Sequence, residues 1–338
     1  MKKSLKIAML ATLVATPALA DTPYVAGALR NMENPLYLPT SGELYTKAGF
    51  GIMYKVTDSN DAQKKLFHDG ADEFPIWRPT LELGYGITDR WAVHGQLGYT
   101  HNRDIHRYGF HLGRLGTTYR IINSGDGWVW DVYGDLHMGG IQKMKGALVN
   151  KGAGLTFAYD NYSNGRWGYH VGTKVGKVWD RWTTSAFVEL LRTWGNHNNE
   201  IDVSRLGMGG MGMPDKISVN LKSTTEFDFG ANAFYQVNDR WSWGVGLKYI
   251  YHAQNGLKDV HTEIPTMLKP AVNNLLEGYK EMHDRFSEFA QSFTLAYQAT
   301  DRTQISWFVE NTLDNGQHLN ANTTDFKIET ALRLNVRF

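Results

Sequence analysis

The sequence predicts an all-β protein, a transmembrane antiparallel up-and-down β-barrel, on three observations. The last thirteen residues alternate between apolar and polar side chains, a short turn pattern recurs along the chain, and no apolar run near 18 residues follows the first twenty. Strict alternation places the two sets of side chains on opposite faces of a strand. A strand with one apolar and one polar face suits a wall between lipid and a wet lumen.

The final strand shows the alternation most clearly. Every second residue from Phe326 to Phe338 is apolar or Thr, and the residues between them include Lys327, Glu329, Arg333 and Arg337. The strand ends on an aromatic side chain. A soluble sandwich would bury its apolar face in a core and would not need an aromatic residue at each end of that face.

A tight turn built around Asp-Arg recurs, and three of its four copies are followed by Trp. Asp favours such turns because its side chain can bond the local backbone, whereas Trp favours the membrane surface. From Trp91 to Tyr99 the strand advances about 26 Å, or roughly 20 Å across a membrane at a tilt of about 40°. The four turns are Thr88-Asp89-Arg90-Trp91, Trp179-Asp180-Arg181-Trp182, Asn238-Asp239-Arg240-Trp241 and Thr300-Asp301-Arg302-Thr303.

The same alternation predicts thirteen strands, and a weak strand at 199–206 makes about fourteen. Single-chain bacterial barrels have even strand numbers, so fourteen is the preferred count and twelve the alternative. The predicted ranges are 44–55, 77–88, 91–100, 108–121, 128–138, 148–160, 166–178, 181–194, 227–237, 241–252, 289–300, 303–313 and 326–338.

Residues 1–20 form a predicted signal peptide. A basic start, an apolar stretch and the small residues Ala18-Leu19-Ala20 have the order of a secretory leader, cleaved after Ala20. The apolar stretch is too short to cross a bilayer as a helix. The chain has no Cys, so a secreted protein of this length would depend on a core or a closed sheet for its stability.

Two segments fall outside the strand pattern. Residues 21–43 contain Pro23, Pro35 and Pro39 and are expected to be irregular, either as a plug inside the lumen or as a periplasmic segment. Residues 255–287 form a long external loop in which apolar residues recur at helical spacing over 266–286, which predicts an amphipathic helix. The barrel itself is expected to cover residues 44–338.

The charge composition excludes one class of partner and leaves the lumen mixed. Lys and Arg balance Asp and Glu to a net charge of +1, which does not indicate a nucleic-acid-binding protein. No cofactor, metal site or catalytic residue is predicted. The alternation assigns these residues to the lumen: Glu82, His94, Gln96, Lys174, Lys248, His252, Arg333 and Arg337.

The terminal segment Arg333-Leu334-Asn335-Val336-Arg337-Phe338 resembles the last strand of Gram-negative outer-membrane β-barrel proteins of the porin-like class. This resemblance implies that Phe338 belongs to an assembly signal read by the barrel-assembly machinery. It also implies that the protein resides among the lipids of the outer membrane. The resemblance does not indicate an oligomeric state.

A second, local resemblance concerns His252-Ala253-Gln254-Asn255, which is similar to the His-x-Ser-Asn segment of lipid A deacylase barrels. In that family the His and Ser act as base and nucleophile. Gln254 stands at the position of the nucleophile, and its amide cannot act as a serine-type nucleophile. The Met- and Gly-rich stretch 205–214 is expected to be a loop.

Taken with the barrel, the polar lumen predicts a pore for small hydrophilic solutes or ions. The alternatives are a structural or surface-interaction barrel filled by its own side chains, and, third, a lipid-modifying enzyme of the outer membrane.

Overall fold

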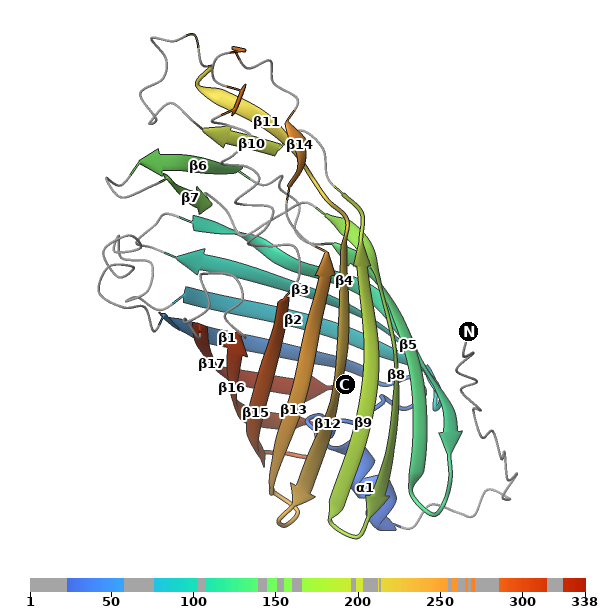
Figure 1. The fold of residues 1–338 in the computed structure, drawn as a ribbon. Coiled ribbons are helices and arrows are strands. Elements are labelled where there is room, and N and C mark those ends of the chain that lie inside the picture. The colour runs from blue at the N-terminus through green and yellow to red at the C-terminus, as the bar shows by residue number, and fades with distance from the viewer. Residues whose placement is uncertain are drawn as a thin grey trace, which may run out of the picture.

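The computed structural model shows a closed barrel with a separate small sheet at one end (Figure 1). It describes residues 23–57, 76–102, 107–138, 145–150, 155–159, 166–195, 199–202, 212, 214–254, 257–260, 265–266, 269–270, 286–314 and 325–338. Among these residues no helix is long and apolar enough to span a bilayer.

Twelve strands close the barrel in the order β1-β17-β16-β15-β13-β12-β9-β8-β5-β4-β3-β2, and β2 pairs with β1. All neighbours are antiparallel. The strands are β1 (Leu44–Thr57), β2 (Ile76–Thr88), β3 (Trp91–Asn102), β4 (Arg107–Asn123), β5 (Trp128–Met138), β8 (Trp167–Trp179), β9 (Trp182–Thr193), β12 (Thr224–Gln236), β13 (Trp241–Gln254), β15 (Phe286–Gln298), β16 (Thr303–Asp314) and β17 (Asp325–Arg337).

The preferred count of fourteen strands is therefore wrong, and the alternative of twelve is the one observed. Two predicted strands belong to the small sheet, whose order is β14-β11-β10-β6-β7. It consists of β6 (Lys145–Asn150), β7 (Leu155–Tyr159), β10 (Asn199–Asp202), β11 (Lys216–Leu221) and β14 (Leu257–Val260). The hairpin β6–β7 lies where the strand 148–160 was predicted, and β10 lies where the weak strand 199–206 was predicted. Alternation indicates that a strand has one apolar and one polar face, but it does not indicate whether that strand crosses a membrane.

The two ends of the barrel differ. At the end called here the turn end, short connections join β2 to β3, β4 to β5, β8 to β9, β12 to β13 and β15 to β16. The small sheet lies beyond the opposite end, the loop end (Figure 1). All four Asp-Arg turns lie at the turn end. The predicted helix at 266–286 falls almost entirely outside the described residues.

The turns are held by a different side chain from the one expected. Asn238 Oδ1 accepts hydrogen bonds from the backbone N–H groups of Arg240 and Trp241 at 2.9 and 2.8 Å. Thr300 Oγ1 does the same for Arg302 and Thr303. The acceptor is thus the residue before the Asp. In the copy at residues 88–91, Thr88 Oγ1 accepts from the N–H of Arg90. In the copy at residues 179–182, Asp180 adopts a left-handed φ of 48°, which Asp tolerates better than most residues.

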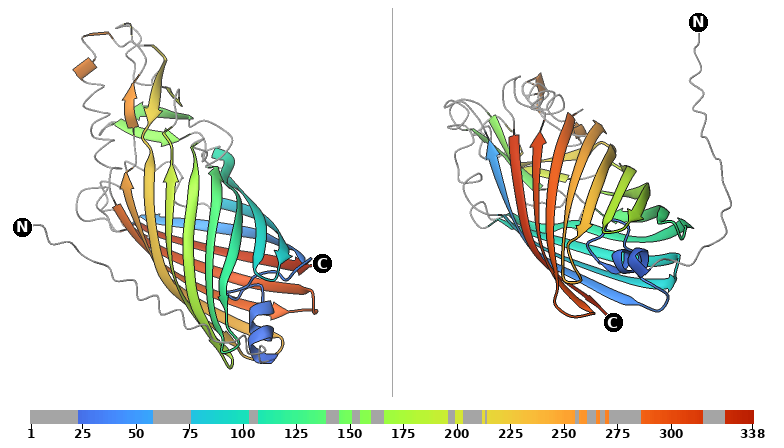
Figure 2. Two further views of the ribbon diagram at one scale, coloured as in Figure 1. Left: turned by 90° about the vertical axis from the view of Figure 1, so that its right-hand side faces the viewer. Right: turned by 90° about the horizontal axis from the view of Figure 1, so that it is seen from below.

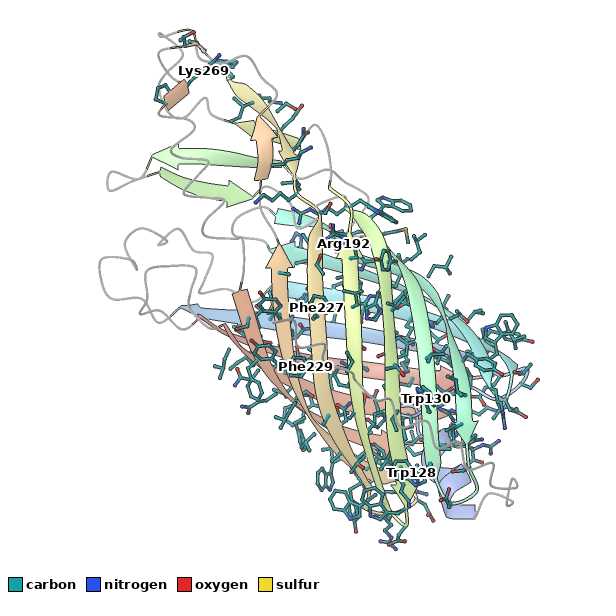
Figure 3. The ribbon with its side chains drawn as sticks, turned by 45° about the vertical axis from the view of Figure 1, so that its right-hand side comes forward. Trp128, Trp130, Arg192, Phe227, Phe229 and Lys269 are labelled. Carbon is teal, nitrogen blue, oxygen red and sulfur yellow. The ribbon has the colours of Figure 1, made fainter. Side chains whose placement is uncertain are left out.

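The outer surface of the barrel is apolar. Exposed side chains on β2 include Leu81, Leu83 and Tyr85, and Leu97 on β3 is 48% exposed. Aromatic residues gather near both ends of this band. Trp91, Trp128, Trp179 and Trp241 are exposed near the turn end, and Trp77, Trp167 and Trp194 near the loop end. Figure 3 shows Trp128 close to the turn end and Phe227 and Phe229 higher on β12.

The chain before β1 was expected to be irregular, yet it begins with a helix, α1 (Pro23–Arg30). Proline suits the first turn of a helix because its missing N–H would have no partner there, and Arg30 in the last turn complements the helix dipole. Seen from the turn end, α1 lies at the mouth of the barrel (Figure 2). Residues 31–43 continue from it to β1. We call residues 23–43 the N-terminal segment.

Candidate functional site: a charged lumen with an occupied mouth

One side of the N-terminal segment is anchored on β4, β5 and β8 by apolar contacts and backbone acceptors. Ala28, Leu29 and Leu36 form a buried cluster with Val129 and Val178 of the wall. Just beside this cluster, two cations bond the carbonyl groups of the segment: Lys174 Nζ donates to Pro35 O at 2.8 Å, and Arg120 donates to Leu36 O. Arg120 is itself paired with Asp131 at 2.8 Å.

The opposite side of the segment faces β16 and β17 and is held only by polar side chains. Glu33 accepts hydrogen bonds from Ser306 Oγ at 2.8 Å and Asn335 Nδ2 at 2.7 Å. Its second oxygen lies 3.4 Å from Arg333 Nη1. Burying a carboxylate is costly unless it is bonded in this way, so Glu33 joins the segment to the last two strands of the chain.

Two asparagines complete the contacts around the mouth. Asn31 donates to Ser242 Oγ of β13 at 3.0 Å and accepts from Gln304 Nε2 of β16 at 2.7 Å. Asn34 donates to Thr183 Oγ1 of β9 at 2.9 Å. These groups are almost completely buried, so the N-terminal segment fills the lumen at this level.

The last part of the segment pairs with β2 before the chain enters β1. Gly42 N donates to Gly86 O at 2.8 Å, and Gly86 N donates to Glu43 O at 2.9 Å. A Cβ at Gly86 would lie 1.9 Å from Thr40 O, so only glycine permits this approach. Burial and the hydrogen bond to Glu43 raise the pKa of the Tyr37 hydroxyl above its usual range, and Tyr37 therefore remains a neutral donor.

A hollow of about 480 Å³ opens at the turn end beside the segment. Its lining includes Arg30, Asn31 and Gln236, together with Asp301 and Arg337 of the rim. Asn31 also belongs to the hydrogen-bond layer between this hollow and the lumen. The hollow therefore reaches a residue that holds the segment to β13.

Above the mouth, a chain of polar groups runs around the inner wall from β3 to β9. His94 Nε2 lies 2.6 Å from Asp135 Oδ1, and Asp135 Oδ2 lies 2.7 Å from His170 Nδ1. His170 Nε2 is 3.5 Å from Glu189, which also accepts a hydrogen bond from Tyr133. Each carboxylate is shared by two partners, which offsets the cost of placing these charges inside the barrel.

Glycines on the intervening strands allow these contacts. Gly116 on β4 lies between His94 and Asp135, and a Cβ there would be 1.8 Å from Asp135 Oδ1. Gly51 on β1 has the same role, since it lies between Arg78 of β2 and Glu329 of β17, which are ion-paired. A glycine on the inner face therefore lets side chains from two strands that are not neighbours meet across the strand between them.

We expect Gly116→Ala to destabilise the barrel, because its Cβ would displace Asp135 from His94. The expected loss is about 1–3 kcal/mol, the range for a buried polar group left without its partner. Urea unfolding in lipid vesicles measures it. Gly95→Ala is the matched control, because a Cβ there approaches nothing closer than 3.8 Å. Equal effects of the two changes would contradict this role of Gly116.

A second polar cluster lies on the wall formed by β12, β13 and β15. His252 is 3.1 Å from Glu226 and 3.5 Å from Glu288, and Lys248 is 3.7 Å from Asp228. Acids outnumber bases in this cluster. On β1, β2 and β4 the basic residues Lys47, Arg78 and Arg114 are more numerous than the acids, so charges of both signs line the lumen.

Solvent exposure changes along the lumen. In the middle, one group of charged side chains keeps 20% to 32% of its surface exposed, namely Arg78, His94, Glu189, Glu226, Lys248 and Glu329, whereas Asp135, His170, Asp228 and His252 keep 3% to 18%. At the mouth, by contrast, Thr183, Ser242, Gln304, Ser306 and Asn335 are at most 1% exposed. Space of solvent size thus remains beside part of the charges in the middle of the barrel, whereas the polar side chains at the mouth are covered by the N-terminal segment.

This barrel has the features of a transmembrane β-barrel: an apolar outer band, an aromatic belt at each end of that band, a polar interior, and short connections at one end only. The chain folds as an outer-membrane β-barrel. In such a barrel closure leaves no free strand edge, and every backbone group within the band has a partner in the sheet.

The sequence of this outer-membrane barrel matches no protein-family model and no curated protein. Among solved structures it is similar to the NanC porin, with 11% identity and a TM-score of 0.44 over 84% of this chain and 98% of that chain. It is similar to the KdgM porin, with 6% identity and a TM-score of 0.39 over 84% and 97%. The Pseudomonas putida toluene transporter TodX is similar at 9% identity and a TM-score of 0.45, over 95% of both chains. These are likenesses of fold alone.

The residues assigned to the lumen from sequence fall into three groups in this barrel. Most have partners at the middle level: Glu82 accepts a hydrogen bond from Tyr45, His94, Lys248 and His252 have the partners given above, and Gln96 lies opposite Glu82 and Arg114 in the strand register. Lys174 and Arg333 hold the N-terminal segment. Arg337 lies at the rim, where it donates to Arg30 O and Asp301 O.

Sequence reasoning missed the residues that organise the site. Asp135 lies within the predicted strand 128–138, but nothing in the sequence indicates that it joins two histidines. His170, Glu189 and Glu226 carried no separate signal. Glu33 and Asn31 lie in a segment without periodicity, so no pattern pointed to them. In the described part of the chain, no cluster of His, Asp and Glu has the arrangement of a metal site.

Proposed function

We propose that this protein is an outer-membrane channel for small hydrophilic solutes or ions whose inner mouth is closed by its own N-terminal segment. The observation that carries the proposal is the change in exposure along the lumen. Several charged side chains of the middle, such as Arg78, Glu226 and Lys248, keep contact with solvent-sized space, and the polar side chains of the turn end are buried by residues 28–38. A channel with one closed end needs only a local movement to conduct.

The turn end is assigned to the periplasm, because bacterial barrels have short periplasmic turns and longer external loops. The small sheet then lies outside the cell. A leader cleaved after Ala20 would make Asp21 the first residue of the mature chain, two residues before α1. The mixed charges of the inner wall favour hydrophilic solutes and do not favour one sign of ion strongly.

Solute uptake by liposomes tests the channel directly. Reconstituted full-length protein is expected to admit small neutral sugars and amino acids slowly and to exclude large ones. A form lacking the N-terminal segment is expected to admit the same solutes faster. If neither form admits any solute while both migrate as folded barrels on unboiled gels, the channel proposal fails.

The second candidate, a filled structural barrel, is favoured by the same burial at the mouth. The two candidates differ in the middle of the lumen, where a filled barrel would leave no exposed charges. The third candidate, a lipid-modifying enzyme, requires a nucleophile near His252. That histidine lies between Glu226 and Glu288 on the inner wall, and Gln254 stands at the nucleophile position. Hydrolysis is therefore not part of the proposal.

Phe338 is proposed to be needed for assembly, in line with the terminal pattern. It is 65% exposed on the outer surface, and its N–H bonds Leu44 O at 2.8 Å, where the last strand meets the first. Phe338→Ser is expected to lower the amount of folded protein in the outer membrane, measured by heat-modifiable migration in membrane fractions. Normal levels of the Ser variant would contradict this, and Phe338→Tyr is the conservative control.

A further inference from the structure

On the lipid-facing surface, three Trp side chains form hydrogen bonds with Thr side chains on neighbouring strands. Trp91, Trp130 and Trp307 each donate an indole N–H to a Thr hydroxyl on the next strand, at 2.6 to 2.8 Å. The acceptors are Thr117, Thr173 and Thr330. Two of these hydroxyls donate onward to a backbone carbonyl. Polar atoms on this surface therefore have partners at these three places.

Gln291 of β15 and Asn311 of β16 depart from this pattern. They lie directly opposite each other in the strand register. Both side chains point outward. Phe289 and Phe293 of β15 and Trp307 of β16, which lie an even number of residues away on the same faces, are exposed. Ala290 and Ser306, which lie on the opposite faces, are buried. Neither amide forms a hydrogen bond within the described part of the chain, and Asn311 Oδ1 is buried without a partner.

The two amides lie within the apolar band. Gln291 is six residues along β15 from Tyr297, whose ring contacts Trp241 at the turn end. Six residues of tilted strand rise about 15 Å, in a band roughly 25 Å tall. Gln291 also lies opposite Leu247 of β13 in the register. Hydrocarbon offers no hydrogen bond to an amide at this depth.

We propose that the outer face of β15 and β16 is the contact between two copies of this chain in the membrane. Gln291 is exposed and its primary amide is both donor and acceptor, so it is complementary to Gln291 of a second copy, whereas Asn311, whose Oδ1 is already buried, can offer only its Nδ2 group. A two-fold axis through these residues would place Gln291 and Asn311 of one copy against the same residues of the other, as isologous interfaces require. Exposed Phe293, Ile305 and Trp307 surround the amides and supply apolar contact.

Cysteine crosslinking tests this contact cleanly, because the chain contains no Cys. Gln291→Cys, oxidised in native outer membranes, is expected to give a reducible species of twice the mass. Leu115→Cys is the matched control. Leu115 is 62% exposed on β4, on the far side of the barrel from β15 in the strand order, and should not crosslink. Equal crosslinking of the two variants, or none at Gln291→Cys, would overturn the proposal.

A second measurement does not depend on thiol chemistry. The double variant Gln291→Leu with Asn311→Leu is expected to lose the dimer and sediment as a monomer in mild detergent, while still migrating as a folded barrel on unboiled gels. A dimer that survives this change would also contradict the proposed face. A wild-type protein that is monomeric, or that carries a different protein or a retained lipopolysaccharide on these amides, would overturn the choice of a second copy as the partner.

Discussion

Deleting residues 24–40 should turn brief, rare openings of the barrel in planar bilayers into a steady and larger conductance. These residues include the cluster of Ala28, Leu29 and Leu36 and the bonds of Asn31 and Glu33 to the wall. The strands themselves pair without them, because every barrel strand bonds two neighbouring strands. The barrel should therefore stay folded, which heat-modifiable migration checks.

The two sides of the N-terminal segment should not release equally. Toward β5 and β8 it buries apolar side chains, and toward β16 and β17 it has only polar bonds. Glu33→Ala removes the carboxylate that Ser306, Asn335 and Arg333 share. A loss of about 2 kcal/mol from such charge-assisted bonds would change the ratio of closed to open states roughly 30-fold, so more frequent openings are expected.

A locked variant provides the opposite test. Asn31→Cys with Ser242→Cys, joined by a short bismaleimide, ties the segment to β13 where the two side chains are now 3.0 Å apart. Conductance should then fall below that of the unmodified protein. Persistent openings in the locked form, together with an unchanged conductance after the deletion, would show that residues 24–40 do not close the pore.

The second large effect is expected at Leu97. This side chain is 48% exposed on the outer face of β3 and lies between Leu81 and Gly113 in the register. Leu97→Arg should cost about 2–4 kcal/mol of folding free energy in lipid, since a charge near the middle of the band loses its hydration. Urea unfolding in vesicles of defined lipid gives this value.

Gln96→Arg is the matched control for Leu97→Arg. Gln96 is the preceding residue on the opposite face, between Glu82 and Arg114 in the register. An added charge there remains in the polar lumen beside a carboxylate and an existing cation, so a change below about 1 kcal/mol is expected. Similar losses for the two variants would mean that the faces of β3 have been assigned the wrong way round.

The faces of individual strands could be predicted from sequence because a period of two is a local property. The outward set of β2 and the outward phase of β17 follow from alternation alone. The number of strands in the barrel could not be predicted in this way. Residues 148–160 alternate as membrane strands do, and only the three-dimensional pairing of β6 with β7 and β10 shows that they belong to another sheet.

The occupied mouth was beyond sequence reasoning for a different reason. Asn31, Glu33 and Asn34 are single polar residues among prolines, and each acquires its role from a partner far along the chain. Glu33 and Asn335, for example, are separated by 302 positions. The polar chain around His94 and Asp135 depends in the same way on Gly116, because an absent side chain on the strand between them makes their contact possible.

The bond between Glu33 and Asn335 also sets an order in time. Residue 33 is made early in synthesis, but its partners Ser306, Arg333 and Asn335 are among the last residues to be added. The polar side of the segment cannot be fully bonded until the final strand is in place, and the pairing of that strand with β1 also closes the wall. The last anchors of the segment and the closure of the cylinder therefore depend on the same strand. A barrel that lacks its final strand would therefore have an open wall and a segment without its bonds to Arg333 and Asn335.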